Sequence, residues 1–394
     1  MLRQQVSLAN YRVPLTIVAA FKIGYFAILL LCINGYGEID SIRGDEIAKR
    51  WFPQGGGAYT PLSTWDSVHY LFLAQHGYRD GSPSCAFYPL WPLAIRCVSI
   101  LTGGNHIIAG LIAANLFSLI ALLLFYDFAR QLKGERVALW ALLLLLSFPG
   151  SLFLNFIYSE ALFLLLIMGL WRSLEQGHPY RSAFFGYLLP LCRGVGIFAV
   201  LPIFWFIGRA WLLNRSSSGS RPRVVQFKDA HPRALAALLC APFAGWGTYL
   251  VWMGIETGNP FEGFEAQKFW RVHSISNLWN LPKFVNSLLE PTSIHDFVGS
   301  ALDRSLFILL LWCLPLIFRL GSSYLIWTYM LGIIPAMSGS FSSFVRFESM
   351  VFPLFLALAV FFQRHDRLGM LFIAVSFVLH AILVWNFVNY AWAG

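Results

Sequence analysis

Charged residues are scarce in this chain of 394 residues. Asp, Glu, Lys and Arg together make up 12% of it, whereas an ordinary soluble domain carries about 25%. Hydrophobic residues instead reach 58%, with 36 Phe and 15 Trp among them. So few charges cannot cover the surface of a soluble domain of this size, and the composition excludes that class. We expect an all-α polytopic membrane protein with one domain over residues 1–394.

Disulfide and metal patterns are also lacking. The six cysteines show no paired or metal-type spacing and mostly lie in apolar runs, which predicts small hydrophobic side chains rather than a disulfide framework or a zinc site. No Asp, Glu or His cluster has the spacing of a metal site, so we expect no obligatory metal and no cofactor. No cleavage site follows the basic residues Arg3 and Arg12, which predicts a retained signal anchor.

Apolar runs long enough to cross about 30 Å of hydrocarbon, alone or with tilt, fill much of the chain. No internal repeat is visible among them, which argues against folds built from inverted transporter repeats. We count eleven runs, several of them short: 14–34, 107–128, 137–153, 157–174, 181–192, 194–213, 234–254, 302–318, 322–338, 350–362 and 368–386.

The basic residues are distributed in a regular way between these runs. With the N-terminus in the cytoplasm, 14 Lys and Arg fall in five inner loops, as the positive-inside rule predicts. The net charge of +9 is thus sorted by loop rather than gathered in one patch, and this excludes nucleic-acid binding. Residues 214–233, with S-S-S-G-S and several basic residues, are predicted to form a cytoplasmic linker. The two long loops, 35–106 and 255–301, fall on the outer side.

The first outer loop, 35–106, is too long to be a mere connector and is rich in aromatic residues, so we expect it to be functional. Gly55 to Gly57 are predicted to form a hinge, and Phe87 to Leu101 to lie on the membrane interface or dip into it. Asp66 and His69 are three residues apart and share one face if the segment is helical. At this point Asp66 is equally a helix N-cap or a reactive carboxylate.

The sequence W-D-S-V-H-Y-L-F-L-A-Q-H-G-Y at 65–78, followed by A-F-Y-P-L-W-P-L, resembles the signature of the second mannosyltransferase of GPI-anchor assembly, the PIG-V type, and its bacterial relatives. Where that family often has R-S or R-P-N-G, this chain has R-G-V-G at 193–196. The resemblance continues in the expected order over nearly the whole chain, at F-I-Y-S-E (156–160), C-R-G-V-G (192–196), G-N-P-F-E-G-F-E-A-Q-K-F-W (258–270) and S-S-F-V-R-F-E-S-M-V-F-P-L (342–354).

This resemblance implies a GT-C-like bundle of about 11 transmembrane helices, whose long outer loops carry interfacial helices and the catalytic residues. It also implies transfer of a mannosyl residue from a polyprenyl-phosphate donor to a lipid-linked or glycan acceptor. Such a reaction needs a base for the acceptor hydroxyl, but no general acid, because the phosphate leaves as an anion. Two carboxylates are needed in glycosidases, whose leaving group is an alcohol. We expect Asp66 to be the base, with inversion at the anomeric carbon.

The donor phosphate calls for cations, and Arg is suited because its fork can bind two oxygens. We expect Arg346 and Arg193 to bind this phosphate, although each could also be a snorkelling or carboxylate-paired arginine. His69 is expected to bind phosphate or to hold Asp66 in place.

Four further residues are expected to contact the acceptor or the sugar. Glu160 could instead orient Arg193, or simply be favoured at a helix start. Gln267 and Trp270 are three residues apart and would present an amide and an indole together on a helix, while Trp65 adjoins Asp66. Trp side chains are also ordinary interface anchors.

Two alternatives stay open. The protein could be a transporter or flippase of a lipid-linked substrate, although such proteins hold ionisable groups near the bilayer midplane, and here they concentrate in the outer loops. It could also be a GT-C enzyme that uses another sugar. The expected membrane is the plasma membrane in a prokaryote, which the modest length favours, or the ER membrane in a eukaryote, with an extracytoplasmic active site. A small membrane partner subunit is left open.

Overall fold

The computed structural model describes residues 11–34, 60–215, 231–270, 274–297 and 299–394. Within these ranges the chain is helical and has no named strand, so the prediction of an all-α protein is confirmed. The predicted hinge at Gly55 to Gly57 and most of the predicted linker at 214–233 lie outside the described residues.

Every apolar run of the sequence falls mainly on helix in the structure. In the described part of the chain, five helices are long and apolar enough to cross a membrane: α1 (Arg12–Asn34), α5 (His106–Lys133), α10 (Pro232–Thr257), α13 (Ala301–Leu320) and α18 (Asp366–Val388). The other runs give shorter helices, namely α6 (Glu135–Ser147), α7 (Glu160–Glu175), α8 (Pro179–Cys192), α9 (Val200–Arg215), α14 (Ser322–Thr328), the π-helical turn η8 (Tyr329–Ile333), α15 (Ile334–Gly339) and α17 (Phe352–Phe362).

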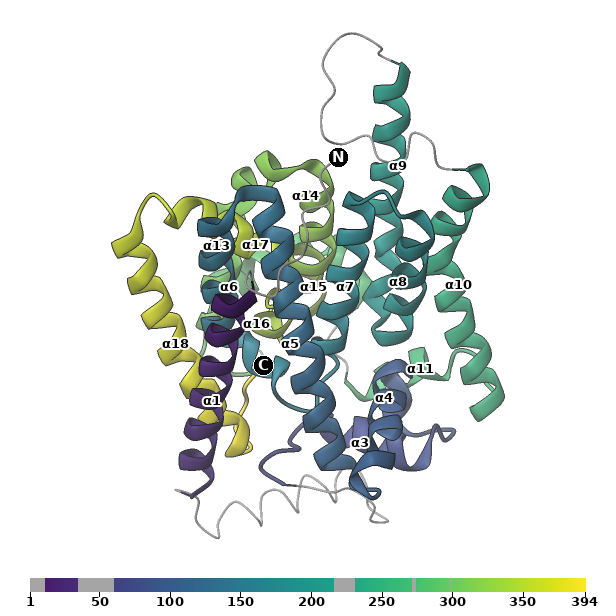
Figure 1. The fold of residues 1–394 in the computed structure, drawn as a ribbon. Coiled ribbons are helices and arrows are strands. Elements are labelled where there is room, and N and C mark those ends of the chain that lie inside the picture. The colour runs from purple at the N-terminus through teal and green to yellow at the C-terminus, as the bar shows by residue number, and fades with distance from the viewer. Residues whose placement is uncertain (1–10, 35–59, 216–230, 271–273, 298) are drawn as a thin grey trace.

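The long helices run side by side, and short helices from the two long loops gather at one end of them (Figure 1). Helix α9 projects from the opposite end (Figure 1). The core lies among α5, α6, α7 and α17, where Trp171 and the apolar side chains of α17 are buried. The short elements are α3 (Asp66–His76), η2 (Pro83–Ala86), α4 (Leu90–Ser99), η3 (Ile100–Thr102), η4 (Pro149–Leu154), η5 (Gly194–Ala199), α11 (Glu262–Glu265), η6 (Ala266–Phe269), η7 (Ile275–Trp279), α12 (Leu281–Leu289) and α16 (Phe344–Glu348).

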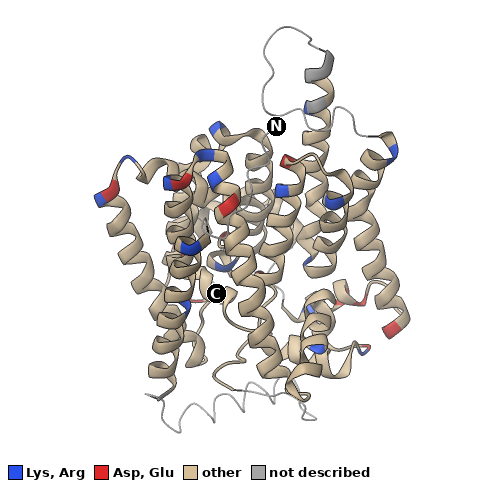
Figure 2. Ribbon diagram, viewed as in Figure 1, with Lys and Arg blue, Asp and Glu red and all other residues tan. Residues whose placement is uncertain are grey.

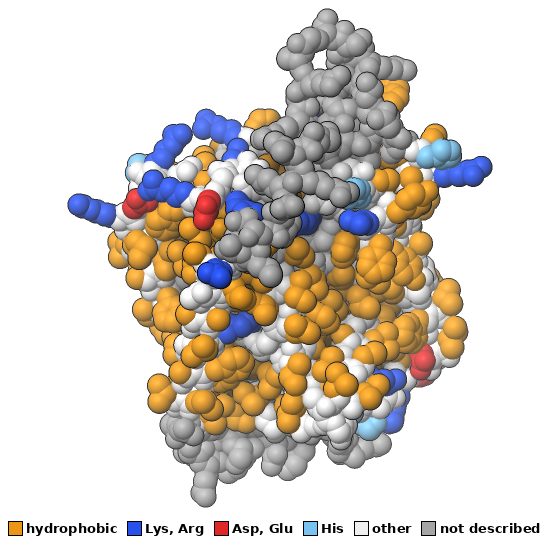
Figure 3. Space-filling model, viewed as in Figure 1, with side chains coloured by type: hydrophobic (Ala, Val, Ile, Leu, Met, Phe, Trp, Pro, Cys, Tyr) orange, Lys and Arg blue, Asp and Glu red, His pale blue; other side chains and the backbone are white. Residues whose placement is uncertain are grey.

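The surface carries an apolar belt. Figure 3 shows hydrophobic side chains covering the middle of the molecule, with Lys and Arg concentrated along one edge. On α1, Ile23 and Leu31 are each 72% exposed, and on α18 Leu371 is 61% exposed. Exposing such long apolar faces to water costs free energy, whereas contact with lipid does not. The belt therefore indicates a multi-pass membrane protein.

Lys and Arg gather at the end from which α9 projects, as Figure 2 shows. The connections between α5 and α6, α13 and α14, and α17 and α18 all lie there, and basic residues lie in each connection or in the helix ends that flank it. The loops that hold α3, α4 and α11 lie at the opposite end (Figure 1). The molecule therefore has one end rich in positive charge and another that carries the short helices.

Candidate active site

Four charged side chains from distant parts of the chain meet beside the short helices. Asp66 is the first residue of α3, Glu160 is the first residue of α7, Arg193 follows α8, and Arg346 lies in α16. Carboxylates at the first turn of a helix are favoured by the helix dipole, which explains the place of both acids. The N-cap position before Asp66 is held by Trp65, so Asp66 is not a capping residue.

Arg346 joins the two carboxylates. Its Nη1 donates to Oδ2 of Asp66 and its Nε donates to Oε1 of Glu160. The guanidinium also lies 4.7 Å from the ring centroid of Tyr158. Because Arg346 is 280 residues from Asp66 and 186 from Glu160, only the folded chain brings this group together.

Arg193 is the second cation on Glu160. Its Nη1 donates to Oε1 of Glu160 at 2.5 Å and to Oγ of Ser159 at 3.2 Å. Its guanidinium lies 5.4 Å from the ring of Phe347, which follows Arg346 in α16. The four side chains thus form an alternating chain of charges, Asp66, Arg346, Glu160 and Arg193, with no net charge. We call it the charge chain.

Burial separates the members of the charge chain. Glu160 is 0% exposed, Arg346 9% and Arg193 13%, while Asp66 is 20% exposed. Among the described residues, none bonds to Oδ1 of Asp66 or to Oε2 of Glu160. Glu160 therefore lies inside and holds both arginines, whereas Asp66 is the more exposed carboxylate of the two.

His69 lies next to the charge chain but in a different environment. It is 1% exposed, its ring stacks on Phe87 at 4.9 Å, and its Nδ1 is 3.0 Å from Oγ of Ser84. Burial lowers the pKa of His69 to about 4, against the opposing effect of Asp66. The imidazole is therefore neutral at neutral pH, and toward a phosphate it can act only as a neutral hydrogen-bonding group.

The remaining predicted residues lie around this cluster. Trp270 packs edge-on against His69 at 5.1 Å, while Gln267 is exposed and donates through Nε2 to the carbonyl of Ala86 at 3.4 Å. Trp65 donates through Nε1 to the carbonyl of Ala391 at 3.2 Å. The second long loop thus packs on the first, but neither Trp65, Gln267 nor Trp270 has a hydrogen bond or ion pair with the charge chain among the contacts described.

Sequence reasoning missed some participants. The hydroxyl of Tyr70 lies 3.0 Å from Oγ of Ser159, which ties α3 to the residue that bonds Arg193. Glu348, in the same motif as Arg346, is fully buried, and neither of its oxygens bonds to a described residue. Burial, together with nearby Asp303, raises the pKa of Glu348 well above its usual range and favours the neutral acid. Glu348 is visible in the sequence as the last residue of the motif F-V-R-F-E, but the sequence does not show that its side chain is buried.

The backbone is strained close to these residues. Trp65, directly before Asp66, has φ of 53°. Ser340, Phe341 and Ser343, just before α16, have φ of 50°, 70° and 56°. Non-glycine residues rarely adopt such angles, and they persist where the surrounding structure enforces them, often at functional sites. Among the described residues, no three His, Cys, Asp or Glu side chains are arranged to hold a metal ion.

Residues 54–209 match the family model described as mannosyltransferase (PIG-V). The resemblance to the PIG-V mannosyltransferases is thereby confirmed for this segment. The PIG-V segment contains Asp66, Glu160 and Arg193, whereas Arg346 lies outside it. The fold thus adds the arginine that links the two carboxylates of the segment.

Curated relatives support the same family. GPI alpha-1,6-mannosyltransferase 2 of Cricetulus griseus is 33% identical over 144 residues, which is 34% of this chain and 28% of that protein. The protein of that name from Mus musculus is 35% identical over the same length and with the same coverage. The similarity therefore spans less than a third of the length of these relatives.

Solved structures give only weak similarity. The Archaeoglobus fulgidus oligosaccharyltransferase, in a complex with Zn and sulfate, has a TM-score of 0.46 at 16% identity and covers 78% of this chain and 45% of its own. The archaeal oligosaccharyltransferase AglB from the same organism, in complex with an inhibitory peptide and a dolichol-phosphate, has a TM-score of 0.44 at 14% identity, with coverage of 94% and 56%. These values carry no weight for the function of this chain.

Proposed function

We propose that the protein is a membrane mannosyltransferase that moves a mannosyl residue from a polyprenyl-phosphate donor to a glycolipid or glycan acceptor. The observation that carries this proposal is the charge chain, in which the partly exposed carboxylate of Asp66 pairs with Arg346, and Glu160 holds both Arg346 and Arg193. Three of its four residues belong to the PIG-V segment. A carboxylate and two guanidinium groups are the parts that transfer from a sugar phosphate requires.

In the proposed reaction, the acceptor hydroxyl oxygen attacks the anomeric carbon of the donor sugar. The bond from that carbon to the phosphate oxygen breaks, and its electron pair leaves with the lipid phosphate. Asp66 takes the hydroxyl proton, and Oδ1 is the oxygen that no described residue occupies. Direct attack from the face opposite the phosphate inverts the configuration at the anomeric carbon.

The arginines stabilise the charge that develops on the phosphate. The Arg346 fork uses Nε and Nη1 within the charge chain, and Arg193 uses Nη1. A guanidinium has five N–H donors, so each arginine keeps donors for phosphate oxygens. Glu160 holds both forks in place before the donor arrives, which reduces the ordering that binding would require.

The aromatic surroundings provide the proposed sugar contacts. We assign these contacts to Gln267, Trp270 and Trp65, with His69 as a neutral hydrogen-bonding group at the donor. The reaction as proposed requires no metal, because the arginines supply the positive charge. Activity that is unchanged by a chelator would support this assignment.

We further propose a GT-C-like bundle of about 11 spans in which the end carrying α3 faces away from the cytoplasm. The concentration of Lys and Arg at the opposite end supports this orientation (Figure 2). In a prokaryote that membrane is the plasma membrane, and in a eukaryote it is the ER membrane. The substrate partners are then a lipid-linked donor and an acceptor on the outer side.

The first test supplies purified protein in detergent with radiolabelled polyprenyl-phosphate mannose and a membrane-lipid extract. Wild type should transfer the label, and Asp66→Asn should lose at least about 100-fold, because the amide keeps the size but cannot accept the proton. Asp80→Asn, which changes an exposed carboxylate of the same loop, is the matched control and should keep full activity. Equal transfer by wild type and Asp66→Asn would show that Asp66 is not the general base. If only a glucose or arabinose donor supports transfer, the proposed reaction stands and only the identity of the transferred sugar changes.

A transporter of a lipid-linked substrate is the second candidate, and Lys22 is the observation that favours it. Its ammonium lies among helices of the bundle, where ionisable groups often mark a transport route. Its Nζ donates to Asn115 at 2.8 Å, Ser118 at 2.8 Å and Asn155 at 2.7 Å, which uses all three of its donors. Because no N–H of the Lys22 ammonium remains to bind a substrate, we place the transporter second. Movement of lipid between leaflets without sugar transfer would reverse the order.

A further inference from the structure

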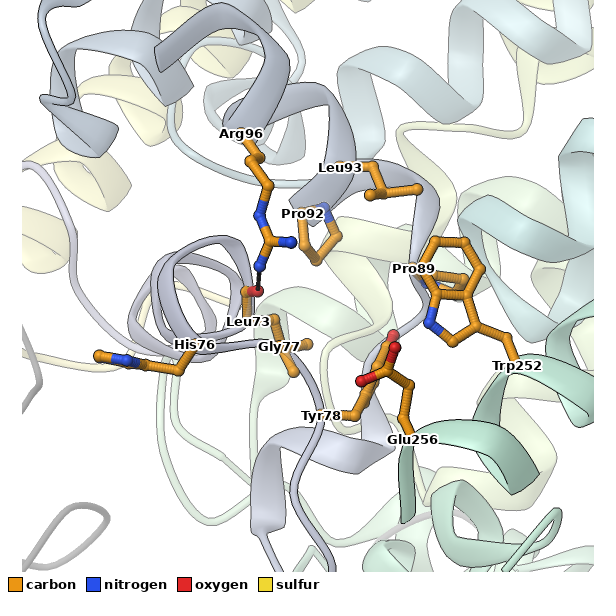
Figure 4. Close-up of a pocket in the computed structure, with 10 residues that line it drawn as sticks. All are labelled: Leu73, His76, Gly77, Tyr78, Pro89, Pro92, Leu93, Arg96, Trp252 and Glu256. Carbon is orange, nitrogen blue, oxygen red and sulfur yellow. Dashed lines mark hydrogen bonds between the residues drawn. The ribbon is translucent and has the colours of Figure 1, made fainter. Parts of the chain in front are cut away.

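A cavity of about 130 Å³ lies between the end of α3, helix α4 and the end of α10 (Figure 4). It is separate from the charge chain. Asp66 begins α3 and His76 ends it, so about 15 Å of helix lies between the two sites. The lining of the cavity includes Leu73, His76, Tyr78, Arg96, Trp252 and Glu256.

Arg96 provides a positive charge on one wall. Its Nε donates to the carbonyl of Ala74 at 2.7 Å and its Nη2 to that of Leu73 at 3.2 Å, as the dashed line to Leu73 in Figure 4 indicates. These bonds fix the guanidinium against the last turn of α3. Its Nη1 makes no hydrogen bond to a described residue, so one side of the fork remains for a ligand.

Glu256 provides a negative charge on the opposite wall. Figure 4 shows its carboxylate on the α10 side of the cavity, next to Trp252 and across from Arg96. None of the described residues makes a hydrogen bond or an ion pair with this carboxylate, and Arg96 and Glu256 do not pair with each other. Two opposite charges that line one small cavity without neutralising each other suit a ligand that carries both signs.

Apart from His76, most of the remaining lining is apolar. Leu73, Pro89 and Pro92 offer no side-chain polar atom, and the hydroxyl of Tyr78 already donates to the carbonyl of Phe87 at 2.7 Å. A sugar ring would place part of its hydroxyls against Leu73, Pro89 and Pro92, which offer them no hydrogen-bonding side chain. The indole of Trp252 instead provides a surface that attracts a cation.

The cavity also adjoins the lipid-facing surface. On α10, Val251 is 63% exposed and Ile255 is 77% exposed, and each directly precedes a residue that lines the cavity. A molecule whose charged end fills the cavity can therefore lay acyl chains along this face of α10.

We propose that the cavity binds the headgroup of a bilayer phospholipid that carries both a phosphate and an ammonium, as phosphatidylethanolamine does. The phosphate binds Nη1 of Arg96, and the ammonium lies between Glu256 and the indole of Trp252. The lipid then bridges α10 to the unit of α3 and α4. This site goes beyond the transfer reaction and does not depend on it.

The test measures binding of short-chain dihexanoyl phosphatidylethanolamine to the full-length protein in detergent, with the phosphatidylglycerol analogue as the second probe. Wild type should bind the ethanolamine lipid saturably and more tightly than the glycerol lipid. Glu256→Gln should weaken binding of the ethanolamine lipid about tenfold or more, since a charged hydrogen bond is lost, and should leave binding of the glycerol lipid nearly unchanged. Glu290→Gln removes an exposed carboxylate that does not line the cavity and should bind both lipids as wild type does.

Trp252→Leu provides a second variant, and it should also weaken binding of the ethanolamine lipid more than that of the glycerol lipid. Size-exclusion profiles that match wild type would confirm that each variant is folded, and if only one variant folds, that variant decides. Unchanged ethanolamine-lipid affinity in the folded variants would overturn the proposal. Displacement of the lipid by free mannose would also overturn it, because the cavity would then be a sugar site. Sugar transfer is measured separately, so a failure here leaves the proposed reaction untouched.

Discussion

At the scale of single residues, Glu160 is the centre of the charge chain. It is fully buried, and its Oε1 accepts from both Arg346 and Arg193. A buried ion pair is a weak source of stability, but removing one partner leaves an uncompensated charge and costs roughly 3–5 kcal/mol. The benefit of this arrangement is positional, because Glu160 fixes Arg193 and also Arg346, which in turn pairs with Asp66.

Replacing Arg346 with lysine should reduce sugar transfer by roughly 30-fold or more. Lysine keeps the positive charge, but its single ammonium does not reproduce the planar fork that reaches Asp66 and Glu160 from two nitrogens. Steady-state kinetics with varied donor should show a higher KM for the donor and a lower kcat. Arg136→Lys, at an exposed pair with Asp366 of 2.6 Å, should leave both constants unchanged. Activity of Arg346→Lys within threefold of wild type would contradict a role for the fork.

At the scale of elements, α16 is only five residues long and depends on its neighbours for its position. Oδ1 of Asp303, in the first turn of α13, accepts from the backbone N–H of Val345 at 2.7 Å. On another side, Gly150 of η4 lies so close that a Cβ there would be 2.0 Å from the carbonyl oxygen of Val345. These two contacts with the backbone of Val345, the residue before Arg346, thus position the backbone from which the Arg346 side chain extends.

Gly150→Ala should therefore push α16 away from η4, lower the Tm and reduce sugar transfer by about tenfold or more, because small misplacement of a catalytic group is costly. Gly247→Ala is the matched control. A Cβ at Gly247 would meet nothing within 4 Å, so in the middle of α10 the change should be neutral or stabilise the helix by about 0.5–1 kcal/mol. Thermal unfolding and transfer would be measured on the same preparations. If both variants behave alike, the contact with Val345 does not position Arg346.

At the scale of the whole molecule, the apolar belt and the uneven distribution of charge predict the orientation in the membrane (Figures 2 and 3). The basic end is expected in the cytoplasm and the end with α3, α4 and α11 outside. In that orientation the charge chain lies toward the outer side, where the proposed lipid-linked donor would reach it from the bilayer.

Labelling with a membrane-impermeant maleimide tests this orientation in intact cells. In a background in which the exposed cysteines Cys97 and Cys240 are replaced by serine, Asp80→Cys should react from outside. Lys133→Cys, at the end of α5, should react only after the cells are permeabilised. The reverse pattern would place Asp66 on the cytoplasmic side and would contradict an extracytoplasmic active site.

The sequence by itself determined the class of the protein and the places of its helices. Apolar run length and low charge are local properties, so each run falls mainly on helix in the structure, although 137–153 is interrupted between α6 and η4 and 322–338 is divided by the π-helical turn η8. Motif resemblance likewise pointed to Asp66, Glu160, Arg193 and Arg346, and of these only Glu160 and Arg193 were linked, as one alternative. None of these local patterns shows whether two residues that are far apart in the chain lie close together in space.

Only the tertiary structure decided which candidates act together. It joined Arg346 to Asp66 and Glu160, buried His69 among aromatic rings, and placed Arg96 opposite Glu256 across a cavity. Pairing of charges and formation of cavities depend on how whole helices pack, which no local pattern encodes. The sequence therefore supplied the residues, and packing of the bundle determined their partners.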